Sequence, residues 1–286
     1  MGEECNRMPE IAVLMPVHNA GRFVREAVAS LQRQTFQDFV LFACDDGSAD
    51  DSWDLLQKMA RNDPRIRLLR NPQNLGITAT LNRLWREAGK GEGVSFCARM
   101  DADDIALPDR LETQRNYLLV HPEIHAVGCF LEIIDEKGCS LGCRRYPETA
   151  EEVHRALLLG NPLPHPALLL RPGLYLTMEG YREIPGAEDY DLWLRAAAAG
   201  YHFANIPRVL LQYRISTGQI KQRSLKPTLR STLRLQRRYL FRKGFFSLSV
   251  CIHYAAGQLL LLLPDRWVME LFMKLTVRRQ KERKQR

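Results

Sequence analysis

The first hundred residues alternate between continuous apolar runs and segments whose apolar side chains recur every three or four positions. The runs have the length of strands and lie at residues 11–17, 39–44, 66–69 and 94–100. Helical spacing follows each of the first three runs, after the turn residues Gly21, Ser48 and Gly76. Strands that alternate with helices of about 10–15 residues are typical of βαβ units. We therefore predict an α/β fold with a Rossmann-like, mostly parallel sheet.

The regular alternation ends near residue 105, and the next hundred residues have an α+β character. The pattern predicts strands at residues 126–134, 166–170 and 209–213, a Gly- and Cys-containing hairpin at 138–146, and helices at 151–159 and 188–200. This half continues directly from the first. We therefore predict one domain over residues 1–218, with halves at about 9–105 and 106–218.

The last 68 residues differ from the rest in charge. Residues 219–286 contain 17 basic and three acidic side chains, whereas residues 1–218 contain 24 basic and 30 acidic ones. The formal net charge of +8 therefore combines an acidic body with a strongly basic tail. Leucines interleave the charges of residues 221–243 at roughly helical spacing, which predicts an amphipathic helix.

An uncharged stretch, residues 245–263, follows this basic segment. At ~1.5 Å per residue its helix would approach the ~30 Å hydrocarbon core of a bilayer. His253 and Gln258 lie inside it, however, and the short apolar pattern after Pro264 also fits an interfacial helical hairpin. We expect monotopic attachment of residues 219–286 to an anionic membrane surface, with a true span and a dimerising tail as alternatives. No nucleic-acid-binding module accompanies the charge, so we expect no nucleic-acid partner.

The cysteines and the N-terminus indicate a reducing location. The seven cysteines form no C-x-x-C pair, and the spacing of Cys139 and Cys143 lacks the second pair that a zinc site needs. The first ten residues contain neither a basic nor an apolar signal region. We therefore expect the cytoplasmic face of a membrane.

Acidic clusters follow the second and fourth predicted strands. Asp45 and Asp46 end one run, and Asp101 and Asp103 follow the other. Open parallel sheets bind their ligands outside the carboxyl ends of strands. The alternative for such a cluster is a solvated helix cap, which is the interpretation that we favour for Asp104 and Asp109 considered alone.

The chain lacks the glycine-rich loops that cradle phosphates. A protein that handles a nucleotide diphosphate without such a loop needs another positive group, and a divalent cation held by carboxylates supplies one. Asp101 and Asp103 are suited to hold it, because two carboxylates this close would otherwise repel each other.

Four ordered segments carry a family resemblance. They are residues 11–23 (IAVLMPVHNAGRF), 44–52 (CDDGSADDS), 74–114 (NLGITATLNRLWREAGKGEGVSFCARMDADDIALPDRLETQ), and 165–195, with HPALLLR at its start and GYREIPGAEDYDLWLR at its end. Together they resemble the successive blocks of glycosyltransferase family 2 over about residues 9–218. The resemblance implies the GT-A fold, with residues 9–105 as the nucleotide-binding half and 106–218 as the acceptor half. It also implies transfer of a single sugar, with inversion, from a nucleotide-sugar donor, such as a UDP-sugar, to an acceptor hydroxyl.

Position by position, the resemblance assigns a set of donor-binding residues. It implies that Pro16 and Val17 lie beside the nucleoside and that Asp46 hydrogen-bonds the base. It also implies that Asp101 lies near the ribose, that Asp103 ligates Mn²⁺ or Mg²⁺ under the diphosphate, and that Arg99 lies close to the phosphates. Two alternatives remain open: Asp46 can simply form the turn before Gly47, and Arg99 can make a structural salt bridge.

The same resemblance implies that Asp189 is the general base. A base opposite the leaving diphosphate gives in-line attack and inversion. The alternative is that Asp189 only caps the predicted helix, whose N-terminus favours an anion. His165 and Glu188 would lie near the acceptor, although a structural role for His165 is as well supported. We interpret His121 and His125 as structural.

Three other functions are weaker explanations of the sequence. A nucleotidyltransferase would carry a Gly- and Arg/Lys-rich loop where this chain has Pro16-Val-His-Asn. An inactive paralogue acting as a membrane-bound scaffold would not need the intact aspartates. Processive synthases that resemble the family carry a Q-x-x-R-W block, which is absent here. The expected acceptor is a saccharide or a lipid-linked saccharide of cell-surface polysaccharide biosynthesis.

Overall fold

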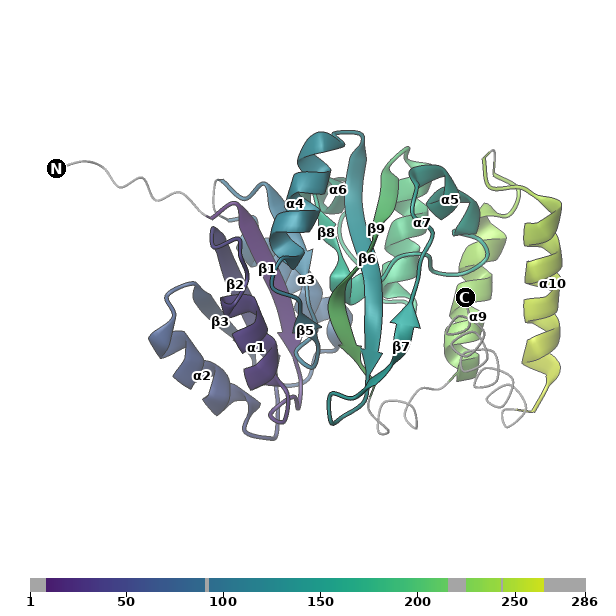
Figure 1. The fold of residues 1–286 in the computed structure, drawn as a ribbon. Coiled ribbons are helices and arrows are strands. Elements are labelled where there is room, and N and C mark those ends of the chain that lie inside the picture. The colour runs from purple at the N-terminus through teal and green to yellow at the C-terminus, as the bar shows by residue number, and fades with distance from the viewer. Residues whose placement is uncertain (1–8, 91–92, 216–224, 243, 265–286) are drawn as a thin grey trace.

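Nine strands form one sheet in the computed structural model, which describes residues 9–90, 93–215, 225–242 and 244–264 (Figure 1). The strands are β1 (Ile11–Val17), β2 (Phe39–Asp46), β3 (Ile66–Asn71), β4 (Phe96–Arg99), β5 (Ile105–Ala106), β6 (Ile124–Ile134), β7 (Ser140–Arg144), β8 (Leu169–Leu170) and β9 (His202–Arg214). Their order is β3-β2-β1-β4-β8-β6-β9-β5, and β7 pairs with β6 outside this path. The first four strands are parallel, whereas β8 is antiparallel to both β4 and β6 and joins the two halves into one sheet.

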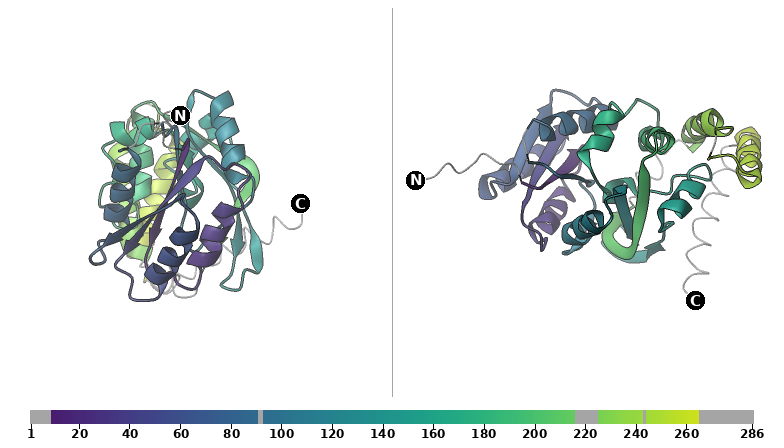
Figure 2. Two further views of the ribbon diagram at one scale, coloured as in Figure 1. Left: turned by 90° about the vertical axis from the view of Figure 1, so that its left-hand side faces the viewer. Right: turned by 90° about the horizontal axis from the view of Figure 1, so that it is seen from above.

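Helices cover both faces of the sheet (Figure 2). They are α1 (Val24–Gln32), α2 (Ser52–Asn62), α3 (Ile77–Ala88), α4 (Arg110–Val120), α5 (Ala150–Ala156), the 3₁₀ helix η1 (His165–Ala167), α6 (Pro172–Thr177), α7 (Glu188–Ala198), α9 (Leu225–Tyr239) and α10 (Leu248–Leu262). All seven residues of β1 are buried, as expected for a strand covered on both sides. Val13 packs in a core with α1, α2 and α4, and its neighbour Leu14 packs in a second core with α3 and α7. Successive side chains of β1 point to opposite faces of the sheet, so this one strand contributes residues to both cores.

The C-terminal helices lie at one end of the molecule (Figure 1). Helix α9 packs against α7, and α10 packs against α9 on the side away from the sheet. Among the described residues, no helix combines the length and the apolarity that crossing a bilayer requires. The predicted apolar segment after Pro264 lies outside the described residues.

Several predicted elements have the expected bounds, and others needed correction. The strand over residues 11–17 is confirmed, and the strand from residue 39 continues to Asp46 because Asp45 and Asp46 still pair with Arg70 and Asn71 of β3. The predicted strand at 166–170 is wrong: η1 occupies its first half, and only Leu169–Leu170 pair with the sheet. The predicted strand at 209–213 is the end of the longer β9, whose first part mixes apolar residues with Asn205, Pro207 and Arg208.

Candidate active site

Three aspartates converge just after β4. The carboxylate oxygens of Asp101, Asp103 and Asp104 lie within 4.8 Å of one another. The segment that carries them leaves β4 at Arg99 and returns to the sheet as β5, which keeps the three side chains together. Asp101 and Asp103 are half-buried, and Asp104 is fully buried. The sequence analysis expected an acidic cluster after this strand but interpreted Asp104, considered alone, as a solvated cap, whereas the structure includes Asp104 in the cluster.

Asp104 is not the solvated cap that its position suggested. Its Oδ1 accepts from the backbone N–H of Arg214, at 2.9 Å, and its buried Oδ2 has no hydrogen-bond partner in the described protein. Burial, together with the charges of Asp101 and Asp103, raises the pKa of Asp104 well above its ordinary value. A cation beside these three carboxylates would relieve that cost. Asp109, the other expected cap, makes no side-chain capping bond and is instead ion-paired with Arg208.

Arg214 supports the cluster from the end of β9. Its Nε donates to the backbone oxygen of Asp103 at 2.8 Å, and its Nη2 donates to Glu26 at 2.6 Å. The residue is 2% exposed and its guanidinium stacks over Phe23 at 4.5 Å from the ring centroid. Arg214 thereby fixes the backbone on which Asp103 and Asp104 stand. It was missed by sequence reasoning, because 110 residues separate it from Asp104.

Arg99 interacts both with the acidic cluster and with the segment that contains Asp189. The residue is buried and forms an ion pair with Asp101. Burial opposes its charge, but Asp101, with smaller effects of Tyr181 and Asp104, outweighs burial, so the pKa of Arg99 is raised and the guanidinium is cationic. The same charge offsets part of the rise in the pKa of Glu188 and of Asp189 that burial causes. Arg99 is therefore electrostatically coupled to both acidic groups.

Asp189 occupies the first turn of α7. Its Oδ2 accepts from Asn161 Nδ2 at 2.7 Å, and its Oδ1 accepts from the backbone N–H of Tyr190 at 2.7 Å. Its side chain is 16% exposed. Burial raises the pKa of Asp189, although these hydrogen bonds oppose the shift. The cap residue Ala187 makes no side-chain bond, so Asp189 holds its position through Asn161 and its own helix.

Two further predicted residues surround Asp189. Burial and the adjacent carboxylate of Asp189 raise the pKa of Glu188 to about 7. His165 Nδ1 lies 3.9 Å from Asp189 Oδ2, and its Nε2 shares a 3.0 Å hydrogen bond with the Tyr181 hydroxyl. Burial, with a smaller effect of Arg99, holds the pKa of His165 well below its ordinary value, so the ring is neutral.

Asp46 is the last residue of β2. Its carboxylate accepts from Asn71 Nδ2 at 2.6 Å and from the backbone N–H groups of Leu75 and Gly76, both at 2.9 Å. It therefore fastens the loop that leads into α3. The next residue, Gly47, has φ +65° and lies so close to this loop that a Cβ would be 2.5 Å from Gln73. A side chain is excluded there.

Pro16 and Val17 end β1 beside β2, opposite Cys44 and Asp45. The following residue, His18, joins this end to the loop after β3: its Nδ1 hydrogen-bonds the backbone oxygen of Asp46 at 2.9 Å, and its Nε2 lies 3.1 Å from Asn74 Nδ2. A carbonyl only accepts, so Nδ1 carries the proton and Nε2 accepts from Asn74. Sequence reasoning missed this role of His18.

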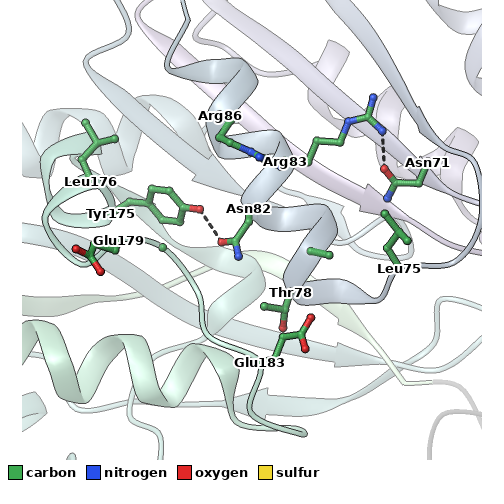
Figure 3. A pocket seen from close by; sticks show the side chains of 12 residues that line it. Asn71, Leu75, Thr78, Asn82, Arg83, Arg86, Tyr175, Leu176, Glu179 and Glu183 are labelled. Atoms are coloured by element: carbon green, nitrogen blue, oxygen red, sulfur yellow. Dashed lines mark hydrogen bonds between the residues drawn. The ribbon is translucent and has the colours of Figure 1, made fainter.

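An open groove of about 530 Å³ lies outside this set of residues (Figure 3). It runs between α3 and residues 175–183, and Asn82 joins its two walls by accepting from the Tyr175 hydroxyl at 2.6 Å and from the Tyr181 N–H at 3.0 Å. No predicted site residue lines the groove. It is a neighbour of the candidate site, connected to it through Tyr181 and His165.

Comparisons with known proteins identify the family. Residues 12–164 match the family described as glycosyl transferase family 2. The chain is 30% identical to EpsE of Bacillus subtilis (strain 168) over 281 residues, which cover 97% of this chain and 98% of that protein. It is 29% identical over 221 residues to the O-antigen biosynthesis glycosyltransferase WbnJ of Escherichia coli, covering 75% of this chain and 83% of that one.

Solved structures share the fold at lower identity. The S. aureus TarS 1–349 complex with UDP-GlcNAc has a TM-score of 0.66 at 16% identity and covers 87% of this chain and 71% of its own. The mannosyltransferase PcManGT of Pyrobaculum calidifontis, in complex with GDP-Man and Mn²⁺, has a TM-score of 0.59 at 17% identity and covers 93% and 73%. The sheet and its helices have the GT-A architecture, and the chain belongs to glycosyl transferase family 2.

Proposed function

We propose that this glycosyltransferase moves a single sugar, with inversion, from a UDP-sugar to an acceptor hydroxyl. The observation that carries the proposal is the coupling of two acidic groups through Arg99: the cluster of Asp101, Asp103 and Asp104 on one side, and Glu188 and Asp189 on the other. A transferase of this kind needs one acidic group for the diphosphate side of the donor and a separate base for the acceptor. In this proposal, the two groups coupled through Arg99 fill these two roles.

The donor set suits a hard divalent cation. Three carboxylates converge within 4.8 Å, and the buried Asp104 Oδ2 has no hydrogen-bond partner in the described protein. Oxygen ligands of this type suit Mn²⁺ or Mg²⁺. In this proposal Asp103 holds the cation, with Asp101 beside it. When bound, the cation supplies positive charge to the diphosphate of the donor.

The chain's own residues position the nucleotide and accept the proton. Pro16 and Val17 flank the nucleoside, and Asp46 accepts from an N–H of the base at the one lone-pair site, on Oδ2, that its three protein donors leave available. Asp189 removes the proton of the attacking hydroxyl, while Asn161 and the N–H of Tyr190 hold its carboxylate in one orientation. Because attack comes from the face opposite the leaving group, the anomeric configuration inverts.

The neighbours of Asp189 select the acceptor. His165 is neutral and hydrogen-bonded to Tyr181, so it can share a hydrogen bond with a sugar hydroxyl without adding charge. Glu188 lies beside Asp189 on the same helix turn and can accept from a second hydroxyl. This combination favours a saccharide acceptor.

The names of the relatives support the class of product. WbnJ is named for O-antigen biosynthesis, and AmsE of Erwinia amylovora, 26% identical over 270 residues, is named for amylovoran biosynthesis. We propose a saccharide or lipid-linked saccharide as acceptor, in the biosynthesis of a cell-surface polysaccharide at the cytoplasmic face of a membrane. A nucleotidyltransferase is less well supported, because the match to family 2 covers the nucleotide-binding half.

Incubation of the purified full chain with a panel of nucleotide sugars and Mn²⁺ tests the proposal. We expect release of a nucleoside diphosphate, loss of release in EDTA, recovery with Mn²⁺ or Mg²⁺, and an inverted anomeric configuration in the product. Asp103→Ala should abolish transfer and weaken donor binding, whereas Asp109→Ala, a matched change outside the cluster, should not. Full turnover in EDTA would exclude the role of the cation, and absence of donor binding with Mn²⁺ would favour an inactive scaffold.

A further inference from the structure

The outward side of α10 is a continuous apolar stripe. Leu248, Ile252, Leu259 and Leu262 are 74%, 63%, 65% and 80% exposed, and Ala255 and Ala256 are exposed between them. Their spacing places them on one side of the helix. The described residues of this segment, 244–264, contain no charged side chain. We call these six residues the α10 stripe.

The opposite side of α10 is already packed. Val250 and Gly257 are buried, and a Cβ on Gly257 would lie 2.7 Å from a methyl group of Leu233 in α9. The α10 stripe is therefore distinct from the side of the helix that packs against α9. It is a second apolar side that the described chain leaves uncovered, at the outer end of the molecule (Figures 1 and 2).

Aromatic and basic side chains extend this surface. Phe241 and Phe246, 77% and 62% exposed, stack at the turn between α9 and α10 with their ring centroids 6.2 Å apart. Exposed arginines follow along α9. They are Arg230, Arg234, Arg237, Arg238 and, just after the helix, Arg242. Residues 225–264 contain no Asp or Glu, so this hairpin is uniformly cationic where it is charged.

We propose that the α10 stripe, with Phe241 and Phe246, lies flat in the surface of an anionic bilayer, held also by the arginines of α9. Apolar side chains next to aromatic and cationic ones are the combination that interfacial helices use. At ~1.5 Å per residue the 15 residues of α10 reach about 22 Å, short of a ~30 Å hydrocarbon core, so the helix lies along the surface and does not cross it.

A second copy of the chain fits this surface less well than an anionic bilayer does. Pairing two α10 stripes would bring two cationic α9 helices together with no acidic residue between them in either hairpin. An anionic lipid surface instead complements the arginines, each of which adds about 1 kcal/mol when it lies near the headgroups.

Attachment through this hairpin orients the catalytic domain. Helix α9 packs against α7, and Gly186, three residues before Asp189, lies so close to Thr228 that a Cβ would be 2.5 Å from its hydroxyl. Gln236 donates to the backbone oxygen of Leu158 at 3.1 Å. If the proposed transfer is correct, the segment that carries the base is thus held on the side of the domain that faces the bilayer, within reach of a lipid-linked acceptor.

Vesicle sedimentation of the full-length chain tests the surface directly. We expect binding to vesicles of phosphatidylcholine with phosphatidylglycerol, and weaker binding to phosphatidylcholine alone. Ile252→Glu with Leu259→Glu should lower the partition coefficient at least about tenfold, since full burial of each such side chain is worth more than a factor of ten. Neutralising Arg234, Arg237 and Arg238 to Gln should lower binding only to the anionic vesicles, by about fivefold for each arginine near the surface.

A matched control separates this effect from a general loss of apolar surface. Leu119→Glu with Val120→Glu changes two exposed apolar residues, 51% and 74% exposed, at the end of α4, and should leave vesicle binding unchanged. Equal binding of the α10 variant and this control would overturn the proposal, as would a dimer that dissociates when the α10 stripe is mutated while vesicles remain unbound. Binding is measured without sugars, and donor turnover without vesicles, so this proposal and the transferase proposal fail independently.

Discussion

Replacing Asp189 with Asn is the most direct test of the proposed base. The change keeps the size of the side chain and removes its ability to accept a proton. Asn can still accept from the N–H of Tyr190, but its amide then opposes the Nδ2 of Asn161, which donates to Asp189 at 2.7 Å. One hydrogen bond is lost, worth about 0.5–1.5 kcal/mol of folding free energy. Because removal of a buried charge offsets part of that loss, we expect the variant to fold.

The effect on catalysis should be much larger than the effect on stability. Loss of a general base lowers rates by about 10²- to 10⁴-fold, or about 2.7–5.4 kcal/mol of transition-state free energy. Donor affinity should remain nearly unchanged, because the side chain of Asp189 is hydrogen-bonded to Asn161 and to the N–H of Tyr190 and not to the acidic cluster. A change in kcat with an unchanged donor KM is the signature of a group that acts only in the transition state.

The assay follows nucleoside diphosphate release at varied donor concentrations in saturating Mn²⁺. Asn161→Ala is the matched control: it removes the same hydrogen bond but leaves the carboxylate, and it should retain most of the turnover. A variant with raised donor KM and unchanged kcat would refute the base and assign Asp189 to the helix cap. Equal losses in Asp189→Asn and Asn161→Ala would show that orientation, and not the charge, is what matters.

Three further changes test the surroundings of the site. Arg214→Lys should lower the apparent affinity for Mn²⁺ in transfer by about 10- to 100-fold, because the guanidinium orients the backbone of the aspartate cluster; an unchanged Mn²⁺ titration would contradict this. Glu188→Gln should remove an ionisation near pH 7 from the kcat/KM profile, because burial and the charge of Asp189 raise the pKa of Glu188 to about 7; a limb near pH 7 that persists in the variant would assign that ionisation to another group. Gly128→Ala should lower the free energy of unfolding by about 1–3 kcal/mol in denaturant titrations, because its Cβ would lie 2.2 Å from Asn205, whereas Gly173→Ala, with no atom within 4 Å, should have little effect.

The first half of the fold could be predicted because its strands are buried on both faces. A strand such as β1 then consists only of apolar residues and stands out from the amphipathic helices around it. The second half was less predictable. Strand β8 has two residues, and the first part of β9 mixes buried apolar residues with polar ones such as Asn205, whose Nδ2 donates to the backbone oxygens of Pro147 and Pro162. Neither feature produces a pattern of hydrophobic residues along the chain.

The residues of the candidate site differ in the same way in how far the sequence could predict them. Asp101, Asp103 and Asp46 could be predicted as site residues because each lies where a buried strand ends, and the ends of parallel strands meet at one edge. Asp104 was misinterpreted because its burial and its hydrogen bond from the backbone N–H of Arg214 depend on residues distant in the sequence. Asn161 and Tyr181 were missed for the same reason: their roles are contacts with Asp189 and His165 across the fold.

The uneven distribution of charge has a physical consequence for the whole molecule. The body, residues 1–218, has six more acidic than basic residues, and the tail has 14 more basic than acidic ones. Near an anionic surface such a molecule experiences a torque, because the tail is attracted while the body is repelled. The α10 stripe lies at the tail end, so the electrostatic orientation and the apolar contact favour the same pose. The two contributions also differ in their salt dependence. High salt should weaken the arginine contribution to vesicle binding and leave the apolar contribution unchanged.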